Sequence, residues 1–272
     1  MAVIYLRVDG FYVGVERRGQ GRGPASVQKG NTLVDISGTA ELCGVERGMS
    51  PTVARRLCPR LEILPWSGNF RAPAEEMRGR LTAITPFIEA IDFHESFLAC
   101  SVQEAMRIPD LIPGAGYRIV VSIASNKFVA RAAGILAAGP GLVLRRVEEA
   151  KERQFIAPFP VGLLEVPGDI KEALRRLGIH RIGDLRFSTE ELERLFGPWA
   201  HVIDQGRNGQ GDSRVKAYGN APWITCEHLE GQPLDDLIRQ RLKTLLDSLE
   251  AGFGIGFLSI TLSGDGPRVI WC

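Results

Sequence analysis

The chain has 272 residues, of which 44% are hydrophobic and 24% charged, and its formal net charge at pH 7 is +1. This length exceeds that of one typical domain and can bury more than one hydrophobic core. The balanced charge excludes a general electrostatic attraction to nucleic acid, so DNA binding would depend on local basic patches. The five cysteines lack CxxC spacing, so the sequence supports neither a disulfide framework nor a zinc site, and no apolar run is long enough to span a bilayer. We expect a cytoplasmic protein.

The first predicted element is an apolar strand over residues 3–8, which ends at Asp9 and leads into a helix from about residue 11. A carboxylate at a strand end can hold a metal ion, and Phe11 and Tyr12, which follow at the turn, can flank a nucleotide sugar. An aspartate that only caps the helix is the simpler alternative. The next predicted elements are strands near 26–36, short helices over 38–46 and 50–58, and a strand at 61–66.

With the first strand, the hydrophobic pattern of the middle of the chain predicts a ferredoxin-like βαββαβ set. Apolar residues at helical spacing over 73–84 predict a helix, and strands at about 87–92 and 96–101 bring Glu95 near the end of the first strand. A strand over 117–123 and a helix over 126–137 complete the set. Between Ser101 and Tyr117 the prolines and glycines argue against a long helix.

The remainder predicts a small helical region and a second, separate α+β segment. Residues 141–158 are predicted to be a connector, followed by helices over 169–177 and 188–196, with Gly178 ending the first of them. This region carries a group of basic residues, read either as phosphate contacts or as a solvated face: Lys171, Arg175, Arg176, His180, Arg181 and Arg186. After a linker over 211–222, residues 223–272 read as a strand, a helix and two strands.

Three ordered segments resemble the palm motifs of Y-family, UmuC/DinB-type DNA polymerases. Those motifs read roughly D-x-D/A-F-Y-A-x-V-E, S-I-D-E-A-Y-L-D and G-I-A-x-N-K-x-x-A-K-x-A-S. The matching residues are Asp9, Phe11, Tyr12, Val15 and Glu16; Glu95, Phe97 and Leu98; and Ile123, Ala124, Asn126, Lys127, Ala130 and Ala133. Residues 161–205 look most similar to the thumb of ImuB-type members, which are polymerase-like proteins without polymerase chemistry.

The resemblance implies an α+β fold with Y-family polymerase architecture, in which a ferredoxin-like βαββαβ palm carries small fingers, a helical thumb and a partial little finger. The implied domains are palm and fingers over 1–140, with fingers at about 20–66, a thumb over 141–210, and a truncated little-finger-like domain over 223–272. The implied DNA-binding residues are Lys127, Lys171, Arg175, Arg176 and Arg181.

The implied chemistry, nucleotidyl transfer, needs carboxylates that hold two Mg²⁺ ions at one sheet edge. The implied catalytic and metal-binding residues, residual or degenerate, are Asp9, Asp92 and Glu95. Read without a gap, His94 stands at an aspartate position, and a neutral imidazole is a poor substitute for a bridging carboxylate. A bulge that returns Asp92 to the site is the alternative.

The nucleotide-binding positions also depart from the family. Gly38 and Glu41 stand where members have a tyrosine and an arginine on the triphosphate, and Ala138 stands where a phosphate-binding lysine is expected. A carboxylate repels a polyanion, and a lost arginine removes charge-assisted hydrogen bonds. In the thumb, Glu165 and Pro167 replace the glycines of a phosphate-binding hairpin.

These departures favour a noncatalytic protein of DNA repair and translesion synthesis, of the kind associated with the SOS response. It would bind damaged or primer-template DNA, or bridge a repair polymerase to an accessory protein, and it would need no cofactor. The alternative is an active error-prone polymerase that uses Mg²⁺, with Tyr12 as the gate against ribonucleotides. A second alternative is a truncated remnant without function.

Overall fold

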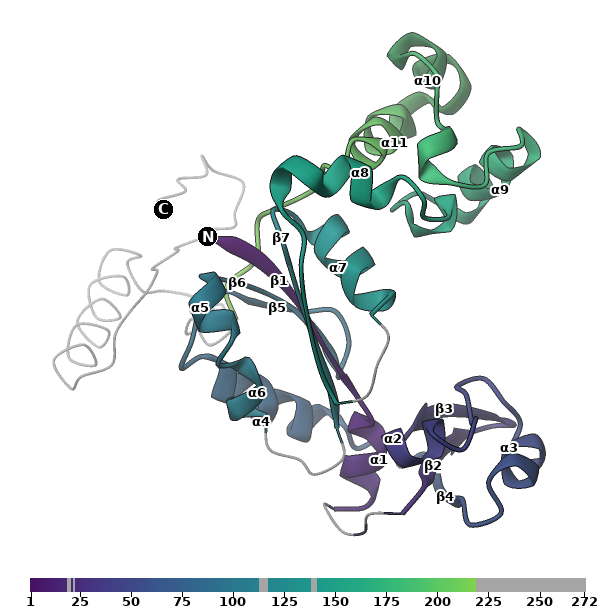
Figure 1. Ribbon diagram of the computed structural model, residues 1–272, viewed down its shortest axis with the longest axis vertical. Helices are drawn as coiled ribbons and strands as arrows, with labels where there is room; N and C mark the ends of the chain where they lie inside the picture. Colours follow the sequence, from purple (N-terminus) through teal and green to yellow (C-terminus); the bar gives the residue numbers. More distant parts are fainter. Residues whose placement is uncertain (19–20, 22, 113–116, 138–140, 219–272) are drawn as a thin grey trace, which may run out of the picture. The chain divides into compact units, whose positions relative to one another are not determined.

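The computed structural model describes residues 1–18, 21, 23–112, 117–137 and 141–218 (Figure 1). Met1–Lys216 form one compact unit, which contains the regions predicted as palm, fingers and thumb. The predicted little-finger-like segment 223–272 lies outside the described residues. No helix in the described part of the chain combines the length and the apolar character that crossing a membrane requires.

A five-stranded sheet forms the palm, in the order β5-β6-β1-β7-β8 (Figure 1). Its strands are β1 (Ala2–Asp9), β5 (Ile88–Ala90), β6 (Glu95–Cys100), β7 (Arg118–Ala124) and β8 (Leu142–Arg146). The central strand β1 pairs antiparallel with both β6 and β7. Val3–Leu6 of β1 are almost fully buried, as expected for a strand covered on both faces.

Four of these strands have the predicted ferredoxin-like arrangement, to which β8 is added. β8 pairs parallel with β7, and the helix α7 (Lys127–Ile135) makes the crossover between them. The connector predicted from residue 141 therefore begins with a palm strand, contrary to expectation. Its apolar residues Leu142–Leu144 extend the sheet next to the apolar strand β7, which favours strand over loop.

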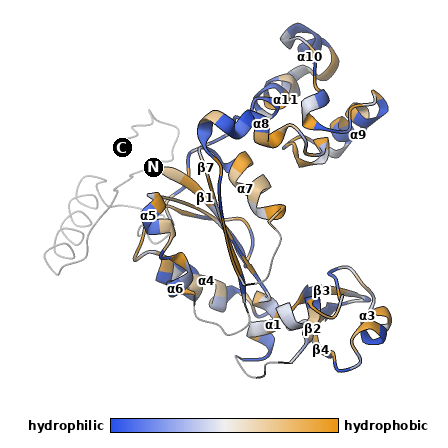
Figure 2. Ribbon diagram, viewed as in Figure 1, coloured by the Kyte–Doolittle hydropathy of each residue, from blue (hydrophilic) through white to orange (hydrophobic). Residues whose placement is uncertain are grey.

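Helices cover both faces of the palm sheet. Figure 1 shows α7 on one face and α4 (Arg71–Leu81), α5 (Val102–Ala105) and α6 (Ile108–Leu111) on the other. Figure 2 shows that α7 is largely apolar, and it packs so closely on β1 that a Cβ at Gly134 would collide with the Tyr5 ring. Between Ser101 and Ile112 the chain forms only the one-turn helices α5 and α6, which agrees with the expectation that no long helix forms there.

The fingers are a three-stranded sheet with its own small core. Its strands, in the order β3-β2-β4, are β2 (Ala25–Lys29), β3 (Thr32–Ile36) and β4 (Glu62–Pro65), joined by α2 (Gly38–Glu41) and α3 (Pro51–Leu57). The helix predicted over 38–46 is a single turn, because Gly44 adopts a positive φ of 81° that ends it. The helix α1 (Phe11–Glu16) connects the palm to this sheet.

The thumb consists of α8 (Glu152–Ile156), α9 (Gly168–Arg176), α10 (Thr189–Phe196) and α11 (Ala200–Arg207). Short 3-10 turns stand between them, at Glu149–Lys151, Val161–Leu163, Ile182–Asp184 and Gly197–Trp199. The two predicted thumb helices are confirmed within one residue. Gly178 follows the C-terminal end of α9, and the capping box of Ser188 marks the start of α10. The helices α8 and α11 were not predicted. One apolar core runs from α7 into the thumb and includes Val129, Leu164 and Leu192.

Candidate functional site: an arginine-caged carboxylate at the palm edge

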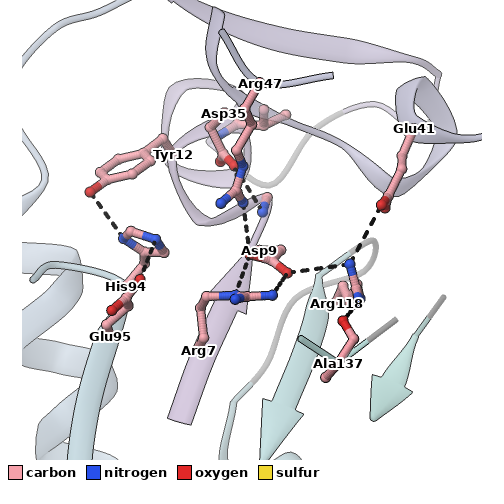
Figure 3. A network of polar contacts seen from close by, with 12 residues as sticks. Arg7, Asp9, Tyr12, Asp35, Glu41, Arg47, His94, Glu95, Arg118 and Ala137 are labelled. Atoms are coloured by element: carbon pink, nitrogen blue, oxygen red, sulfur yellow. Dashed lines mark hydrogen bonds and ion pairs between the residues drawn. The ribbon is translucent and has the colours of Figure 1, made fainter. Parts of the chain in front are cut away.

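Asp9 lies at the end of β1, as predicted, and it is surrounded by guanidinium groups (Figure 3). Its carboxylate contacts the side chains of Arg7, with Nε 2.9 Å from Oδ1, and Arg47, with Nη2 2.8 Å from Oδ1. A third guanidinium, that of Arg118, places Nη1 3.7 Å from Oδ2. The side chain of Asp9 is only 11% exposed, so these contacts replace most of its solvation.

Each arginine reaches Asp9 from a different direction. Strand geometry explains the positions of Arg7 and Arg118. Arg7 lies two residues before Asp9, and alternation along a strand directs both side chains to the same face. Arg118 is the cross-strand neighbour of Asp9 on β7. Arg47 comes from the fingers and is the only one of the three outside the palm sheet. Burial alone would raise the pKa of Asp9, but Arg47 and Arg7 hold it below its ordinary value.

Asp35 is a second buried carboxylate, which sequence reasoning missed. It accepts hydrogen bonds from the backbone N–H groups of Gly10 and Val13, each at 3.2 Å, and from Arg47 at 2.9 Å. Burial raises the pKa of Asp35 even though Arg47 opposes the shift. Arg47 therefore bridges Asp9 of the palm and Asp35 of the fingers, and its own pKa is raised by these two carboxylates against the effect of burial.

Asp92, His94 and Tyr12 form a separate polar group on the β6 side of Asp9. The Tyr12 hydroxyl donates to Asp92 Oδ2 at 3.2 Å and lies 3.1 Å from His94 Nδ1. Asp92 also accepts a hydrogen bond from the backbone of Phe93, and its side chain is 50% exposed. The carboxylate of Asp92 thus bonds to the turn that carries it and to Tyr12.

Glu95 begins β6, directly opposite Arg7 in the register of β1 and β6. His94 Nε2 lies 3.6 Å from Glu95 Oε1, and Arg131 lies 3.9 Å from the other oxygen. Burial lowers the pKa of His94, although Glu95 opposes the shift, so the imidazole is neutral at pH 7. Arg7, a cation, is thus a neighbour of both carboxylates, because its guanidinium contacts Asp9 and its backbone is paired with Glu95 across the sheet.

These residues do not fit the Mg²⁺ ions that the fold family implies. A bound Mg²⁺ ion needs oxygen ligands that converge on one point, whereas the Asp9 oxygens are directed to guanidinium nitrogens. No group of three or more His, Cys, Asp or Glu residues suited to a metal ion occurs in the described part of the chain. In this arrangement Asp9 is the ion-pair partner of the arginines and is not placed as a metal ligand.

A cavity of about 260 Å³ opens beside Asp9, between the palm edge and the first turn of the fingers. Gly38 and Glu41, the two positions predicted to lack the triphosphate contacts, both line it. Three arginines and three carboxylates share its wall, so the cavity has no net positive charge to attract a triphosphate: Arg7, Arg47, Arg118, Asp9, Glu41 and Glu46. Glu41 lies 3.5 Å from Arg118 and competes for that cation.

Phe11 and Tyr12, the predicted nucleotide-binding aromatics, are buried at the start of α1. The ring of Tyr12 packs against Trp66 and Phe70, with centroids 5.0 Å and 4.8 Å away, and against His94. Neither ring is among the residues that line the cavity. Their contact with a nucleotide sugar stays a prediction, and in this structure the Tyr12 hydroxyl is already hydrogen-bonded.

The third motif, at the start of α7, joins the palm to the thumb. The Lys127 ammonium contacts Glu89 and Asp212, each at 2.8 Å, and these carboxylates outweigh burial to raise its pKa. Asn126 donates to Glu152 at 3.0 Å and to the carbonyl of Gly209 at 2.8 Å. Lys127 is thus engaged by two carboxylates, and its predicted contact with DNA stays a prediction.

The predicted DNA-binding residues of the thumb lie on α9 or a few residues after it in the chain. Arg175 and Arg176 are exposed, and both contact Glu172, at 3.8 Å and 3.3 Å. Arg181 is exposed just beyond α9, and Lys171 is half-buried on it. This face can offer guanidiniums to phosphates, in competition with Glu172.

The arginines are the residues that sequence reasoning missed. Arg7 carried a usable signal, because the family's first motif has two acidic positions separated by one residue and this chain reads Arg7-Val8-Asp9. No sequence signal marked Arg47 or Asp35, since only the folding of the fingers brings these two residues to Asp9.

Comparison with known proteins finds a matching family model and similar proteins. Residues 6–134 match the model of the impB/mucB/samB family. DNA polymerase IV of Marinomonas sp. (strain MWYL1) is 28% identical over 257 residues, which cover 86% of this chain and 72% of that protein. DNA polymerase IV 1 of Bacillus subtilis (strain 168) is 25% identical over 281 residues, covering 91% of this chain and 66% of that protein.

Solved structures show the same fold. A Dbh ternary complex superposes with a TM-score of 0.64 at 19% identity, covering 80% of this chain and 69% of that one. DinB from Sulfolobus solfataricus gives a TM-score of 0.59 at 19% identity, covering 80% and 70%. The predicted Y-family polymerase fold is therefore confirmed for the described residues.

Proposed function

We propose that this chain, which has the Y-family polymerase fold, is a noncatalytic DNA-binding or bridging factor of DNA repair, similar in this respect to ImuB-type proteins. The observation that carries the proposal is the cage of Arg7, Arg47 and Arg118 around Asp9. In a polymerase, a carboxylate at this edge would hold metal ions between the attacking and leaving oxygens. Arg7 instead supplies a fixed positive charge, with no open coordination site for a phosphate oxygen.

The cavity beside Asp9 supports the same proposal. Its wall has no net charge, and Glu41 reaches Arg118, a cation that could otherwise meet a phosphate. Each of these features weakens triphosphate binding independently of the metal ligands. The loss of chemistry therefore depends on several residues, and no single substitution is expected to restore it.

DNA binding is proposed from the relatives and from the thumb. The relatives are DNA polymerases by name. The exposed arginines of α9 offer a basic surface of modest size. We expect weak, steeply salt-dependent binding of primer-template DNA, because each phosphate contact contributes a slope of about −0.9 in log K against log salt.

A primer-extension assay tests the proposal. The full chain should bind a labelled primer-template in fluorescence anisotropy and add no nucleotide with Mg²⁺ or Mn²⁺, while Bacillus subtilis DNA polymerase IV 1 serves as the extending control. Extension that disappears in Asp9→Ala would establish the alternative, an active polymerase. Absence of both extension and DNA binding would favour the remnant without function.

A further inference from the structure

The two edge strands of the palm sheet differ in length and in their contacts. The edge strand β5 is three residues long, and its Glu89 is bonded to Lys127 and to the backbone N–H of Lys216. The other edge strand, β8, is five residues long and pairs only with β7 among the described strands. An unpaired edge can pair with another chain, and proteins usually shorten, cover or charge such an edge. The edge that the described part of the chain leaves open is therefore β8.

The hydrogen bonds at the two ends of β8 show which of its backbone groups face outward. The carbonyl of Gly141 accepts a hydrogen bond from β7, and the N–H of Val147 donates one to β7. The direction of the backbone groups alternates from residue to residue along a strand. The N–H and C=O groups of Leu142, Leu144 and Arg146 are therefore directed away from β7, to the open edge.

The side chains of β8 combine exposed apolar groups with positive charge. Leu142 and Leu144 are 54% and 41% exposed, and strand alternation places them on the same face. Arg146 is exposed, and Arg145 has its guanidinium 5.0 Å from the centroid of the Phe155 ring. No carboxylate of the described residues lies within ion-pair distance of either arginine. A strand that pairs with β8 therefore gains most from apolar residues opposite the leucines and acidic residues opposite the arginines.

We propose that β8 is the docking site for an extended acidic segment of a partner protein, which adds a sixth strand to the palm sheet. The segment runs antiparallel to β8, the slightly more stable arrangement. Its sequence is then two acidic residues, opposite Arg146 and Arg145, followed by three apolar residues, opposite Leu144 to Leu142. In this mode of recognition the main-chain hydrogen bonds supply affinity and the side chains supply specificity.

A second copy of this chain fits the same edge less well. Two antiparallel copies of β8 would bring four arginines and no carboxylate into one strand pair. Two five-residue strands also bury far less surface than the roughly 800 Å² per partner of a stable interface, so reversible docking of a segment is favoured over a permanent dimer. The proposal rests on the bridging role given above. Its test involves neither DNA nor nucleotide, so its failure differs from a failure of the noncatalytic assignment.

Fluorescence anisotropy of the full chain with a labelled synthetic peptide tests the proposal. The probe carries Glu-Glu-Val-Leu-Val between Gly-Ser flanks and should bind the wild-type chain. A peptide with lysines in place of the glutamates should bind about tenfold more weakly, since two attractive pairs become repulsive. Backbone N-methylation of the two valines, whose N–H groups face Leu144 and Leu142, should abolish binding. Methylation of the leucine, whose N–H points away from β8, should weaken binding far less.

Variants of β8 separate backbone pairing from side-chain contact. Leu144→Pro removes an outward N–H but no hydrogen bond to β7, a position where an edge strand tolerates proline, and it should abolish binding. Leu144→Ala keeps the N–H and should weaken binding only about threefold. Leu177→Ala, at an exposed leucine of the thumb, is the matched control and should bind as the wild type does. Circular dichroism checks that each variant is folded.

A charge exchange gives a result that stands even if Leu144→Pro unfolds. Arg146→Glu changes an exposed residue, and it should weaken the glutamate probe and strengthen the lysine probe. No binding of the glutamate probe to the wild-type chain, or equal binding of the probe methylated at its valines, would overturn the proposal. A wild-type dimer in sedimentation velocity that Leu144→Pro converts to a monomer would also overturn it, because the edge would then belong to a second copy.

Discussion

The edge of the palm at Asp9 and the joint between palm and thumb at α7 both carry residues that match family motifs, but these residues have different roles. At the joint, Asn126 and Lys127 make contacts that the fold itself needs, with Glu152, Gly209 and Asp212. At the edge, Asp9 is held by arginines that leave it no free oxygen for a metal. A motif match therefore indicates the fold directly. It indicates activity only where the surrounding side chains leave the motif residues available for the reaction.

The joint should show the largest effect on stability. Glu152 is 3% exposed and accepts hydrogen bonds from Ser125 N and Oγ, both at 2.6 Å, and from Asn126 at 3.0 Å. Glu152→Ala removes the acceptor of three hydrogen bonds at this largely buried joint and should lower the free energy of unfolding by about 3 kcal/mol. Urea denaturation measures this loss. Glu149→Ala, an exposed glutamate of the preceding turn, should change stability by less than about 0.5 kcal/mol.

A substitution at the palm edge should lower the free energy of unfolding less than one at the joint, since Arg47 is partly exposed. Arg47→Met removes the cation from the buried Asp35 and should lower the free energy of unfolding by about 2 kcal/mol at pH 7. The pKa of Asp35 is raised by burial, so its protonation on acidification relieves the unpaired charge, and the loss should shrink as pH falls. Arg56→Met, at an exposed position of α3, is the control. A loss that grows on acidification would contradict the role given to Asp35.

The thumb surface should have a moderate effect, seen in DNA affinity. Charge reversal of Arg175 and Arg176 together should weaken primer-template binding about tenfold or more and reduce the salt slope by about 1 for each lost contact. The same loss is expected for every DNA sequence, because phosphates carry no sequence information. Arg194→Glu, on the exposed side of α10, serves as the matched control. If Arg194→Glu weakened binding as much as the change at Arg175 and Arg176, the assignment of α9 as the DNA-binding surface would be wrong.

The smallest effect is expected at His94. Burial lowers the pKa of His94 in the folded state, so the fold binds fewer protons than the unfolded chain below the ordinary value of 6.5. Stability should therefore fall as pH decreases below 6.5, and His94→Gln should remove this part of the slope. Thermal unfolding between about pH 7.5 and about pH 5.5 measures it. A slope that persists unchanged in His94→Gln would contradict this assignment.

Much of the fold could be predicted from the sequence, because strand alternation and helix caps are local signals. The strand before Asp9, the shortened region after Ser101 and the thumb helix that begins after Ser188 were all predicted from residues within a few positions. The strand β8 was not predicted, because its apolar run is too short to be distinguished from a connector by sequence alone. Its strand conformation depends on pairing with β7. Helix α2 was predicted too long because the predicted range extended past Gly44, whose positive φ ends the helix.

The site was predicted only in part. Gly38 and Glu41 line the cavity beside Asp9, and their predicted effect on triphosphate binding stays a prediction. The contacts of Asp9 with Arg47, and of Lys127 with Asp212, join residues distant in the sequence. Such pairs leave no local pattern, and only the folded chain reveals that the charge of each is already neutralised.

Manganese binding tests the central claim, that Asp9 holds guanidiniums in place of metal ions, most directly. Electron paramagnetic resonance of Mn²⁺ mixed with equimolar protein should show the signal of the free ion for the wild-type chain and for Asp9→Asn alike. Arg7→Asp should reduce the free signal, because it removes a cation that contacts Asp9 and adds a carboxylate two residues from Asp9 and opposite Glu95. Bound Mn²⁺ in the wild-type chain that is lost in Asp9→Asn would contradict the account.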